Sequence, residues 1–436
     1  MMYQKWIELG LQKGLSDIEV FAVKSKSLKL SIYQQKLDQH VQSDVEVAVI
    51  RGIYQGKLAT VKIEDFSDAF VSQVLDDLII NAQLLTASEP HRIFEGSPSY
   101  VKVADELFDF SSVPVQDKIT MLKTLEQEIL KHPKAQQVQT TIYQEVESKT
   151  SIVNSKGLNL SRHHTYAFSY AIGVFQDNDE TKVSYDVKLA KTFDQFNPIE
   201  MAEKTIQKGV SKLGASSLQT KHYPTVFSNE MFSNMISVFT SIFSGESAYR
   251  NLTKLKDKVG VKIASPRFNL IDDPFHELAN FKVPFDDEGV ACEKRYVIKE
   301  GVFQGFNHNL KTSAIFNEKP TGHGFNGGIA PTNLYLKPEE TSFEALIQSI
   351  DEGIYITDLI GLHAGVKTVS GDFSLQAAGF LIEKGKLFRP VKMIVVFGNF
   401  FEMIEQIEGI GNDLKFDIEG VGSPSVYIKS LSISGS

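Results

Sequence analysis

The chain has 436 residues, which at ~150 residues per domain predicts two or three domains. Hydrophobic residues make up 42% and charged residues 23%, as in ordinary folded globular proteins, which excludes fibrous and disordered classes. The 54 acidic residues outnumber the 45 basic ones, and the net charge of −9 disfavours nucleic acid and anionic lipid as partners.

The cysteine count and the hydropathy of the chain indicate the cellular compartment in which the protein is expected. Cys292 is the single cysteine, so no intrachain disulfide can form, which favours a reducing compartment. The N-terminal residues lack the apolar core of a signal peptide, and the apolar runs, such as 393–397, are far shorter than the roughly 18 residues that span a bilayer. We therefore expect a cytoplasmic protein that does not cross a membrane.

Helical and strand patterns alternate at the start of the chain. A short amphipathic helix is predicted over 5–13. A longer helix is predicted over 66–86, where apolar residues recur at i, i+3, i+4 and i+7 and Ser67 or Asp68 can cap the first turn. Between the two helices, runs rich in apolar residues predict strands over 18–24, 28–34 and 45–54.

The same alternation continues to about residue 218. A helix over 115–131 ends before Pro133, and several strands over 138–189 are separated by turns at 154–157 and 177–179, which predicts an antiparallel meander. Asn197-Pro198 predicts the start of another helix, which runs to about Lys212. The small residues at 214–217 resemble a linker.

The predicted fold class is therefore α+β with two domains. Residues 1–218 form an N-terminal α/β domain with an antiparallel sheet and covering helices, and residues 219–436 form a β-rich C-terminal domain. Short strands separated by Gly, Pro and Asn dominate the second domain. Its predicted helices span 232–243, 341–350 and 400–407.

Two motifs resemble known site signatures incompletely. His276-Glu277 begins like the zinc-protease pattern, but Asn280 stands where the second histidine is required, and no capped helix is evident. The segment 322–328 nearly satisfies the G-x-G-x-x-G pattern, but prolines bracket it where a phosphate site needs a strand and a helix. Both segments are predicted to be loops.

Other polar turns have two interpretations each. The acidic clusters Asp272-Asp273 and Asp286-Asp287-Glu288 could hold a hard cation or supply an acid–base pair, but aspartates also stabilise turns through the following backbone. The hydroxyl-rich segment 368–374 lacks the G-x-S-x-G pattern of a nucleophile loop, which favours a polar hairpin turn. Composition and spacing alone do not assign a reaction.

A series of short motifs resembles, in order, the motifs of the TldD/PmbA family, also called modulator of DNA gyrase. They are Asp272-Asp273-Pro274, Phe285-Asp286-Asp287-Glu288-Gly289, Gly301-Val302, Pro331-Thr332-Asn333, Ser370-Gly371-Asp372-Phe373-Ser374, Gly411-Asn412-Asp413-Leu414 and Ser423-Pro424-Ser425. The resemblance is strongest from about residue 222 to the end. It implies an α/β domain followed by a β-rich domain, in agreement with the periodicity.

The resemblance also distinguishes two branches of the family. TldD-like chains carry an H-E-x-x-x-H zinc helix and a late cysteine ligand, whereas PmbA (TldE)-like chains lack both and pair with a TldD-like chain. At the zinc-helix position this chain has residues 231–243, which contain no histidine and no carboxylate, and no cysteine lies between Gly411 and Ser425. The PmbA/TldE branch is the better match.

The resemblance therefore implies a metal-free subunit of a zinc protease complex that cleaves peptides or unfolded proteins. Zinc is expected only in the TldD-like partner, because this chain lacks the ligands that would lower the pKa of a bound water toward ~7. No catalytic or metal-ligating residue is assigned. Loops on a rigid β scaffold commonly carry function. The residues expected to contact substrate or partner are Asp286, Asp287, Thr332, Asn333, Ser370 and Asp372.

Other functions stay open. One is a self-contained homodimeric hydrolase that holds a hard cation at the acidic turns. Another is a non-enzymatic adaptor, which would give the gyrase-related family name a meaning. Direct DNA binding is disfavoured by the net charge of −9.

Overall fold

The computed structural model describes residues 2–86, 90–103 and 107–435, which form two compact units. The first unit comprises the described residues of Met1–Gly96 and Lys102–Gly214. The second comprises those of Ser97–Val101 and Ala215–Ser436, so a short segment from the N-terminal half of the chain belongs to it. The domain boundary near residue 218 stays a prediction.

The first unit is built on one antiparallel sheet with the order β3-β2-β1-β4-β5-β6, in which β7 also pairs with β5. This confirms the predicted antiparallel sheet, including turns at residues 155–156 and 178–179. The strands are β1 (Asp17–Tyr33), β2 (Lys36–Tyr54), β3 (Lys57–Ile63), β4 (Ala135–Asn154), β5 (Asn159–Asp177), β6 (Glu180–Ser184) and β7 (Lys188–Ala190).

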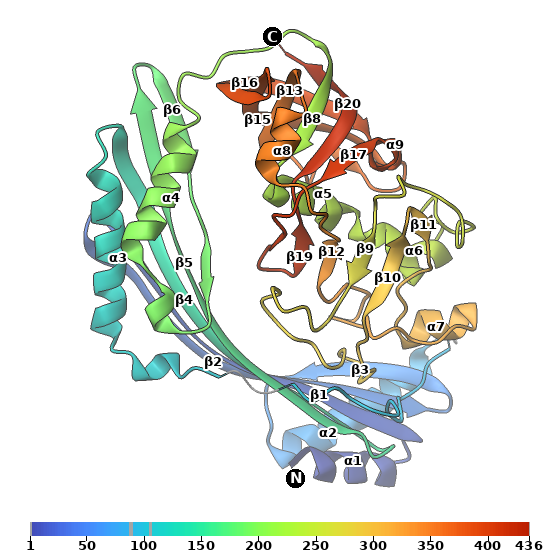
Figure 1. The fold of residues 1–436 in the computed structure, drawn as a ribbon. Coiled ribbons are helices and arrows are strands. Elements are labelled where there is room, and N and C mark those ends of the chain that lie inside the picture. Colours follow the sequence, from blue (N-terminus) through green and yellow to red (C-terminus); the bar gives the residue numbers. More distant parts are fainter. Residues whose placement is uncertain (1, 87–89, 104–106, 436) are drawn as a thin grey trace. The chain divides into compact units, whose positions relative to one another are not determined.

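Four helices of the described part of this unit cover one face of the sheet (Figure 1). The residues of β1 explain why the helices lie on one face, because alternate side chains of a strand point to the same face of the sheet. Val20 and Ala22 pack with the helices at one end, and Leu28 and Leu30 pack with those at the other. The helices are α1 (Met2–Gln12), α2 (Asp68–Leu84), α3 (Val115–Leu130) and α4 (Pro198–Val210), and short 3-10 turns occur at Phe110–Ser112 and Phe193–Gln195.

The predicted helices of this half are confirmed, but two predicted strands were wrong in extent. Strands expected over 18–24 and 28–34 form the single strand β1. The polar stretch around Lys26 interrupts the apolar pattern without interrupting the backbone, because Lys26 lies opposite Asp44 of β2 and Glu147 of β4. Backbone pairing with both neighbouring strands thus continues through this exposed, charged position.

The second unit contains two sheets, which confirms the predicted β-rich half. One has the order β11-β10-β9-β12-β19-β18, and the other β13-β8-β20-β16-β15-β14, with β17 paired to β20. The strands are β8 (Lys221–Phe227), β9 (Leu270–Asp272), β10 (Arg295–Lys299), β11 (Val302–Phe303), β12 (Leu334–Leu336), β13 (Glu352–Ile360), β14 (Val366–Lys367), β15 (Asp372–Glu383), β16 (Lys386–Asn399), β17 (Ile407–Ile410), β18 (Lys415–Phe416), β19 (Val421–Ser423) and β20 (Val426–Ser434).

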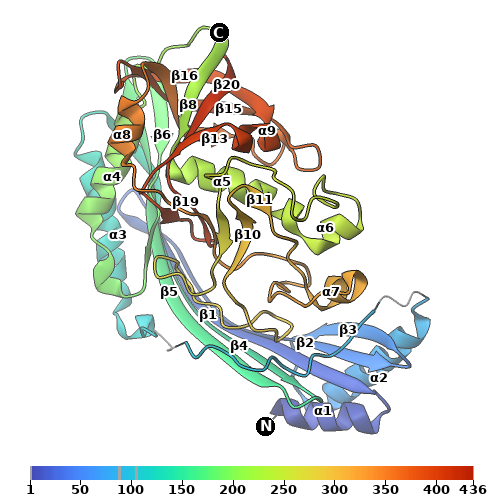
Figure 2. The ribbon, with the colours of Figure 1, turned by 45° about the vertical axis from the view of Figure 1, so that its right-hand side comes forward.

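The helix α5 connects these two sheets through a shared hydrophobic core. It contacts β19 of one sheet and β8 and β13 of the other, and Figure 2 shows it between them. The helix predicted over 232–243 is α5 followed by a 3-10 turn at Thr240–Phe243, and two further helices of this unit were not predicted, α6 and α7. The helices are α5 (Asn229–Phe239), α6 (Gly245–Tyr249), α7 (Leu310–Phe316), α8 (Phe343–Gln348) and α9 (Phe400–Glu405).

Within the described ranges, every helix is too short or too polar to span a bilayer.

Candidate functional site

A buried carboxylate at the end of β9 organises the loop that precedes β12. Asp272 accepts hydrogen bonds from Nε2 of His323 at 3.1 Å, from the N–H of Thr332 at 3.0 Å and from the Thr332 hydroxyl. Burial raises the pKa of Asp272, but the charge of His323 and the hydrogen bonds from His323 and Thr332 together hold it below its ordinary value of 3.8. Asp272 is therefore a charged anchor inside the protein.

The acidic turn at 285–289 anchors the other end of the same loop. Asp286 is buried, and its carboxylate accepts hydrogen bonds from the N–H groups of Glu288 (3.0 Å), Val290 (2.9 Å) and Gly324 (2.8 Å). Asp287 accepts a hydrogen bond from the N–H of Asn326 at 2.9 Å. Burial, with a smaller contribution from the neighbouring Glu288 charge, raises the pKa of Asp286 to about 7.

The glycines of the segment 322–328 permit close packing against this turn. Gly322 has φ +73°, and a Cβ there would lie 2.7 Å from the carbonyl oxygen of Ala291. A Cβ on Gly324 would lie 2.6 Å from the Glu288 carboxylate. The predicted loop is confirmed, and its glycines are explained by these contacts, with no phosphate required.

The segment Ser97–Val101 adds to the acidic turn from a distant part of the sequence. The Tyr100 hydroxyl donates a hydrogen bond to the carbonyl oxygen of Gly289 at 2.7 Å, and its ring meets the ring of Phe285 edge to face. The N–H of Ala291 donates to the Ser97 hydroxyl at 3.0 Å. The turn is therefore held from both sides within the second unit.

A second polar cluster lies in the turn between β14 and β15. The hydroxyl of Ser370 donates to Asp372 at 2.7 Å, and Nδ2 of Asn399 donates to the Ser370 carbonyl (2.8 Å) and to Asp372 (2.9 Å). Nζ of Lys254 also donates to the Ser370 carbonyl at 2.7 Å. The hydrogen bonds that Asp372 accepts from Ser370 and, to a smaller extent, from Asn399 lower the pKa of this exposed carboxylate, which stays charged.

A pocket of about 310 Å³ lies beside this second cluster. It contains amide, ammonium and carboxylate groups, and it shares Lys254 and Asn399 with the Ser370 turn. Its lining residues are Lys254, Leu255, Lys258, Val261, Lys262, Ile263, Asn399, Phe401, Glu402 and Glu405.

The residues singled out in the sequence thus belong to two clusters. Thr332 and Asn333 contact Asp272, and Asp286 and Asp287 contact the loop at 324–326, so these residues fix one continuous segment. Ser370 lies in the turn between β14 and β15 of the other sheet, and Asp372 is the first residue of β15. Sequence reasoning missed the partnership of Asp272 with His323, although both residues stood within motifs already noted.

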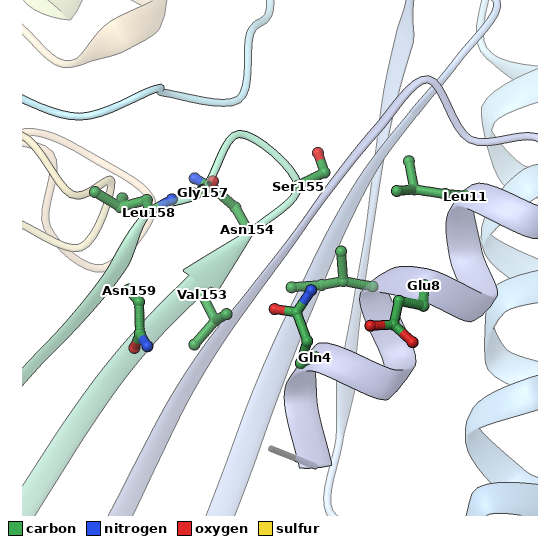
Figure 3. A pocket seen from close by; sticks show the side chains of 10 residues that line it. Gln4, Glu8, Leu11, Val153, Asn154, Ser155, Gly157, Leu158 and Asn159 are labelled. Carbon is green, nitrogen blue, oxygen red and sulfur yellow. Dashed lines mark hydrogen bonds between the residues drawn. The ribbon is translucent and has the colours of Figure 1, made fainter.

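A further pocket, of about 270 Å³, lies in the first unit between α1 and the turn that joins β4 to β5 (Figure 3). Among the described residues that line it, Glu8 is the one carboxylate and none is a histidine, so these side chains offer no acid–base pair. The lining residues are Gln4, Ile7, Glu8, Leu11, Val153, Asn154, Ser155, Gly157, Leu158 and Asn159.

The donor set around α5 does not fit a zinc ion. The helix directs Met231, Phe232, Met235 and Phe239 into the core, and the hydroxyl of Ser233 donates to the Val421 carbonyl at 2.9 Å. Thioether, hydrocarbon and an already bonded hydroxyl are not ordinary zinc ligands. Elsewhere, the described residues contain no group of three His, Cys, Asp or Glu side chains placed to hold a metal ion.

Sequence and structure comparisons identify the relatives of this chain. Residues 108–213 match the PmbA/TldA metallopeptidase central domain, and residues 220–435 match the PmbA/TldA metallopeptidase C-terminal domain. A metalloprotease PmbA homolog from Buchnera aphidicola is 27% identical over 452 residues, which cover 98% of this chain and 95% of that protein.

Solved structures share the complete fold. A crystal structure of a proposed modulator of a DNA gyrase from Thermotoga maritima has a TM-score of 0.93 and 28% identity, and the match covers 99% of both chains. TldE from Thermococcus kodakarensis has the same fold, with a TM-score of 0.88, 21% identity and all of both chains covered. This chain belongs to the PmbA/TldD family.

Proposed function

We propose that this chain is a PmbA/TldE-like subunit without a metal of its own, which pairs with a TldD-like zinc protease to act on peptides or unfolded proteins. The main support for this proposal is the composition of α5, because its inward-facing side chains are hydrophobic core residues and not metal ligands. Hydrolysis by metal-activated water would then depend on the partner, and this chain would bind and position the substrate. A cytoplasmic location stays a prediction.

In this proposal, the exposed site residues contact the substrate or partner, and the buried ones hold a loop in position. Asp372 is exposed and charged beside the pocket of the Ser370 turn, so Ser370 and Asp372 are the proposed direct contacts to substrate or partner. Asp286, Thr332 and Asn333 are buried and hydrogen-bonded. Their proposed role is to position the loop 322–333, and Asp287 assists by holding Asn326.

The alternative of a hard cation at the acidic turns has less support. A cation binds carboxylate oxygens, but the oxygens of Asp272 and Asp286 already receive N–H and ring donors in short hydrogen bonds. A cation would have to displace several backbone donors, each of which would then be buried without a partner.

The test compares the lone chain with the complex. Elemental analysis of the purified chain should find no stoichiometric metal, and the chain alone should not cleave a labelled unfolded protein. Adding a TldD-like subunit that carries the complete zinc helix should give a stable complex that does cleave it. Stoichiometric metal together with peptidase activity in the lone chain would reject the proposal.

A matched pair of variants then tests the contact residues. Asp372→Asn should raise the KM of the complex several-fold, because it removes an exposed charge beside the pocket. Asp351→Asn, at another exposed position of the same unit, should leave the KM unchanged. Equal KM values for the two variants would remove Asp372 from the proposed contact surface.

A further inference from the structure

The pocket of the Ser370 turn has two walls that are fixed to one hydrophobic core. One wall is the segment 254–263, and the other is Asn399 together with α9. Apolar side chains of both walls enter the same core. The N–H of Ser265, just beyond the first wall, donates a hydrogen bond to the Ile404 carbonyl of α9 at 3.0 Å. The walls are therefore held in place by the fold, and the pocket is formed before any ligand binds.

The two walls carry charges of opposite sign. The first wall presents Lys254, Lys258 and Lys262, and the second presents Glu402 and Glu405. All five residues are exposed, and in the part of the chain that the structure describes none of them forms an ion pair. The ammonium groups therefore repel one another without a protein carboxylate close enough to neutralise them. A bound anion would relieve this repulsion.

Local structure does not account for all of these charges. Glu405 is the last residue of α9, where the helix dipole disfavours a carboxylate. Lys254 donates a hydrogen bond to the Ser370 carbonyl at 2.7 Å, and its Nζ lies 5.8 Å from the centre of the Phe401 ring. An ammonium group has three N–H donors, so Lys254 can still donate to a ligand. The half-buried Phe401 ring adds an apolar surface to the lining.

We propose that this pocket binds the C-terminal end of a peptide whose last residue is basic. The α-carboxylate of the peptide pairs with Lys258 and Lys262, and the basic side chain of the last residue pairs with Glu402 and Glu405. The apolar stem of that side chain packs on the Phe401 ring. The pocket's role in proteolysis rests on the proposed function, because it names the part of the substrate that the Ser370 turn meets.

The charge pattern favours a peptide end over other ligands. An inorganic anion would pair with the lysines, but the two carboxylates of the other wall would repel it. An internal basic segment of a protein would pair with the carboxylates, but it would offer no anion to the lysines. The volume of about 310 Å³ lies at the lower end of the range for ligand pockets, which begins at about 300 Å³. Such a pocket suits a terminal residue better than a long segment.

Peptide binding to the full chain tests the chemistry of the ligand. The probe is a short N-acetylated peptide of glycine and serine that ends in arginine, and isothermal titration calorimetry measures its Kd. Replacing the terminal carboxylate by an amide should weaken binding about tenfold, since two ammonium groups lose their partner. Replacing the arginine by alanine should weaken it about threefold to fivefold. Equal Kd values for the acid and the amide would overturn the proposal, as would competition by inorganic phosphate as strong as that by the unmodified peptide.

A matched pair of lysine variants locates the carboxylate. Lys258→Gln should weaken binding of the acid peptide about threefold to fivefold and leave binding of the amide unchanged. Lys256→Gln is the control, because Lys256 is exposed on the same segment but lies outside the lining, and its Nζ donates to the Asn251 side chain at 2.7 Å. The control should bind like the native chain. Equal Kd values for the two variants would place the carboxylate elsewhere and overturn the proposal.

A matched pair of glutamate variants locates the basic side chain. Glu402→Gln should weaken binding of the arginine peptide about threefold to fivefold and leave binding of the alanine peptide unchanged. Glu344→Gln is the control, because Glu344 is an exposed residue in the first turn of α8, as Glu402 is in the first turn of α9. Thermal unfolding of each variant checks that the fold is intact. An equal loss for the arginine and alanine peptides would contradict the proposed pairing.

These measurements need no second subunit, so the pocket and the proposed function are tested separately. A chain that binds the peptide through Lys258 and Glu402 but gives no active complex with a TldD-like subunit would support the pocket and contradict the proposed function. A chain that forms an active complex but does not bind the arginine peptide would overturn the pocket and leave the proposed function intact.

Discussion

The carboxylate of Asp272 and the imidazole Nε2 of His323 lie 3.1 Å apart in the interior of the second unit, although 51 positions separate them in the chain. Both side chains are almost completely removed from water. The contact ties the end of β9 to the loop that leads into β12. A buried pair of this kind stabilises the fold only while both partners are present, because either one alone is a buried polar group without compensation.

Asp272→Asn should therefore lower the free energy of unfolding by about 3–5 kcal/mol at pH 7. The folded-state pKa of Asp272 lies below the unfolded value of 3.8, so its stabilising contribution is complete above pH 3.8 and is lost as the pH falls through the folded pKa. Urea unfolding at pH 7, 5 and 3 measures this. The loss of unfolding free energy in Asp272→Asn should be equal at pH 7 and pH 5 and smaller at pH 3. The control Asp351→Asn should lose little unfolding free energy at any of these pH values.

The stabilising contribution of Asp286 is expected to depend on pH in the opposite direction. Burial raises its pKa to about 7, so the folded state retains a proton that the unfolded chain releases near pH 3.8. Its contribution to stability should fall as the pH rises from about 4 to about 7, by at most about 1.4 kcal/mol per pH unit. Asp286→Asn should remove this slope. Parallel stability curves for the variant and the native chain would contradict the assignment.

A buried ion pair in the first unit gives a separate stability prediction. Lys118 is 1% exposed and its Nζ lies 2.6 Å from the Glu145 carboxylate, which also accepts a hydrogen bond from Tyr143. Lys118→Met should cost about 3–5 kcal/mol, and adding Glu145→Gln should recover part of the loss. Lys131→Met, which breaks the exposed pair with Glu128, should cost under about 1 kcal/mol. Thermal and urea unfolding measure these differences.

Two turn glycines with the same backbone angle separate conformational strain from close packing. Gly56 and Gly301 both have φ +77°, but a Cβ on Gly56 would meet no atom within 4 Å, whereas one on Gly301 would lie 2.3 Å from the carbonyl oxygen of Ala264. Gly56→Ala should cost about 1–2 kcal/mol from strain alone. Gly301→Ala should cost roughly 1–3 kcal/mol more. Equal losses in urea unfolding would contradict the predicted close approach.

The fold was predictable from the sequence where local chemistry decides it. Asn197 was expected to start a helix, and its side chain accepts hydrogen bonds from the N–H groups of Ile199 and Glu200 at the start of α4. The apolar periodicity of α2 predicted its buried face in the same way. These signals lie within one or two helical turns, so no knowledge of the fold is required to recognise them.

Elements that depend on distant residues were not predictable in this way. The short helix α7 begins where the N–H of Leu310 donates to the Glu288 carboxylate at 2.7 Å, and no local pattern reveals that donor–acceptor pair. The same limit applies to the candidate site. The motifs containing Asp272, Asp286 and Thr332 were recognised in order, but which carboxylate receives which donor depends on strand pairing between β9 and β12.

The segment Ser97–Val101 has a consequence for any attempt to divide this protein. A fragment that begins at Ala215 would lack Ser97 and Tyr100, and it would leave the N–H of Ala291 and the ring of Phe285 without contacts that they have in the whole chain. A single cut in the polypeptide therefore cannot produce a C-terminal fragment that keeps all of these contacts. A fragment of the C-terminal half would need to include the segment Ser97–Val101 as well, for example as a fused or separately supplied peptide.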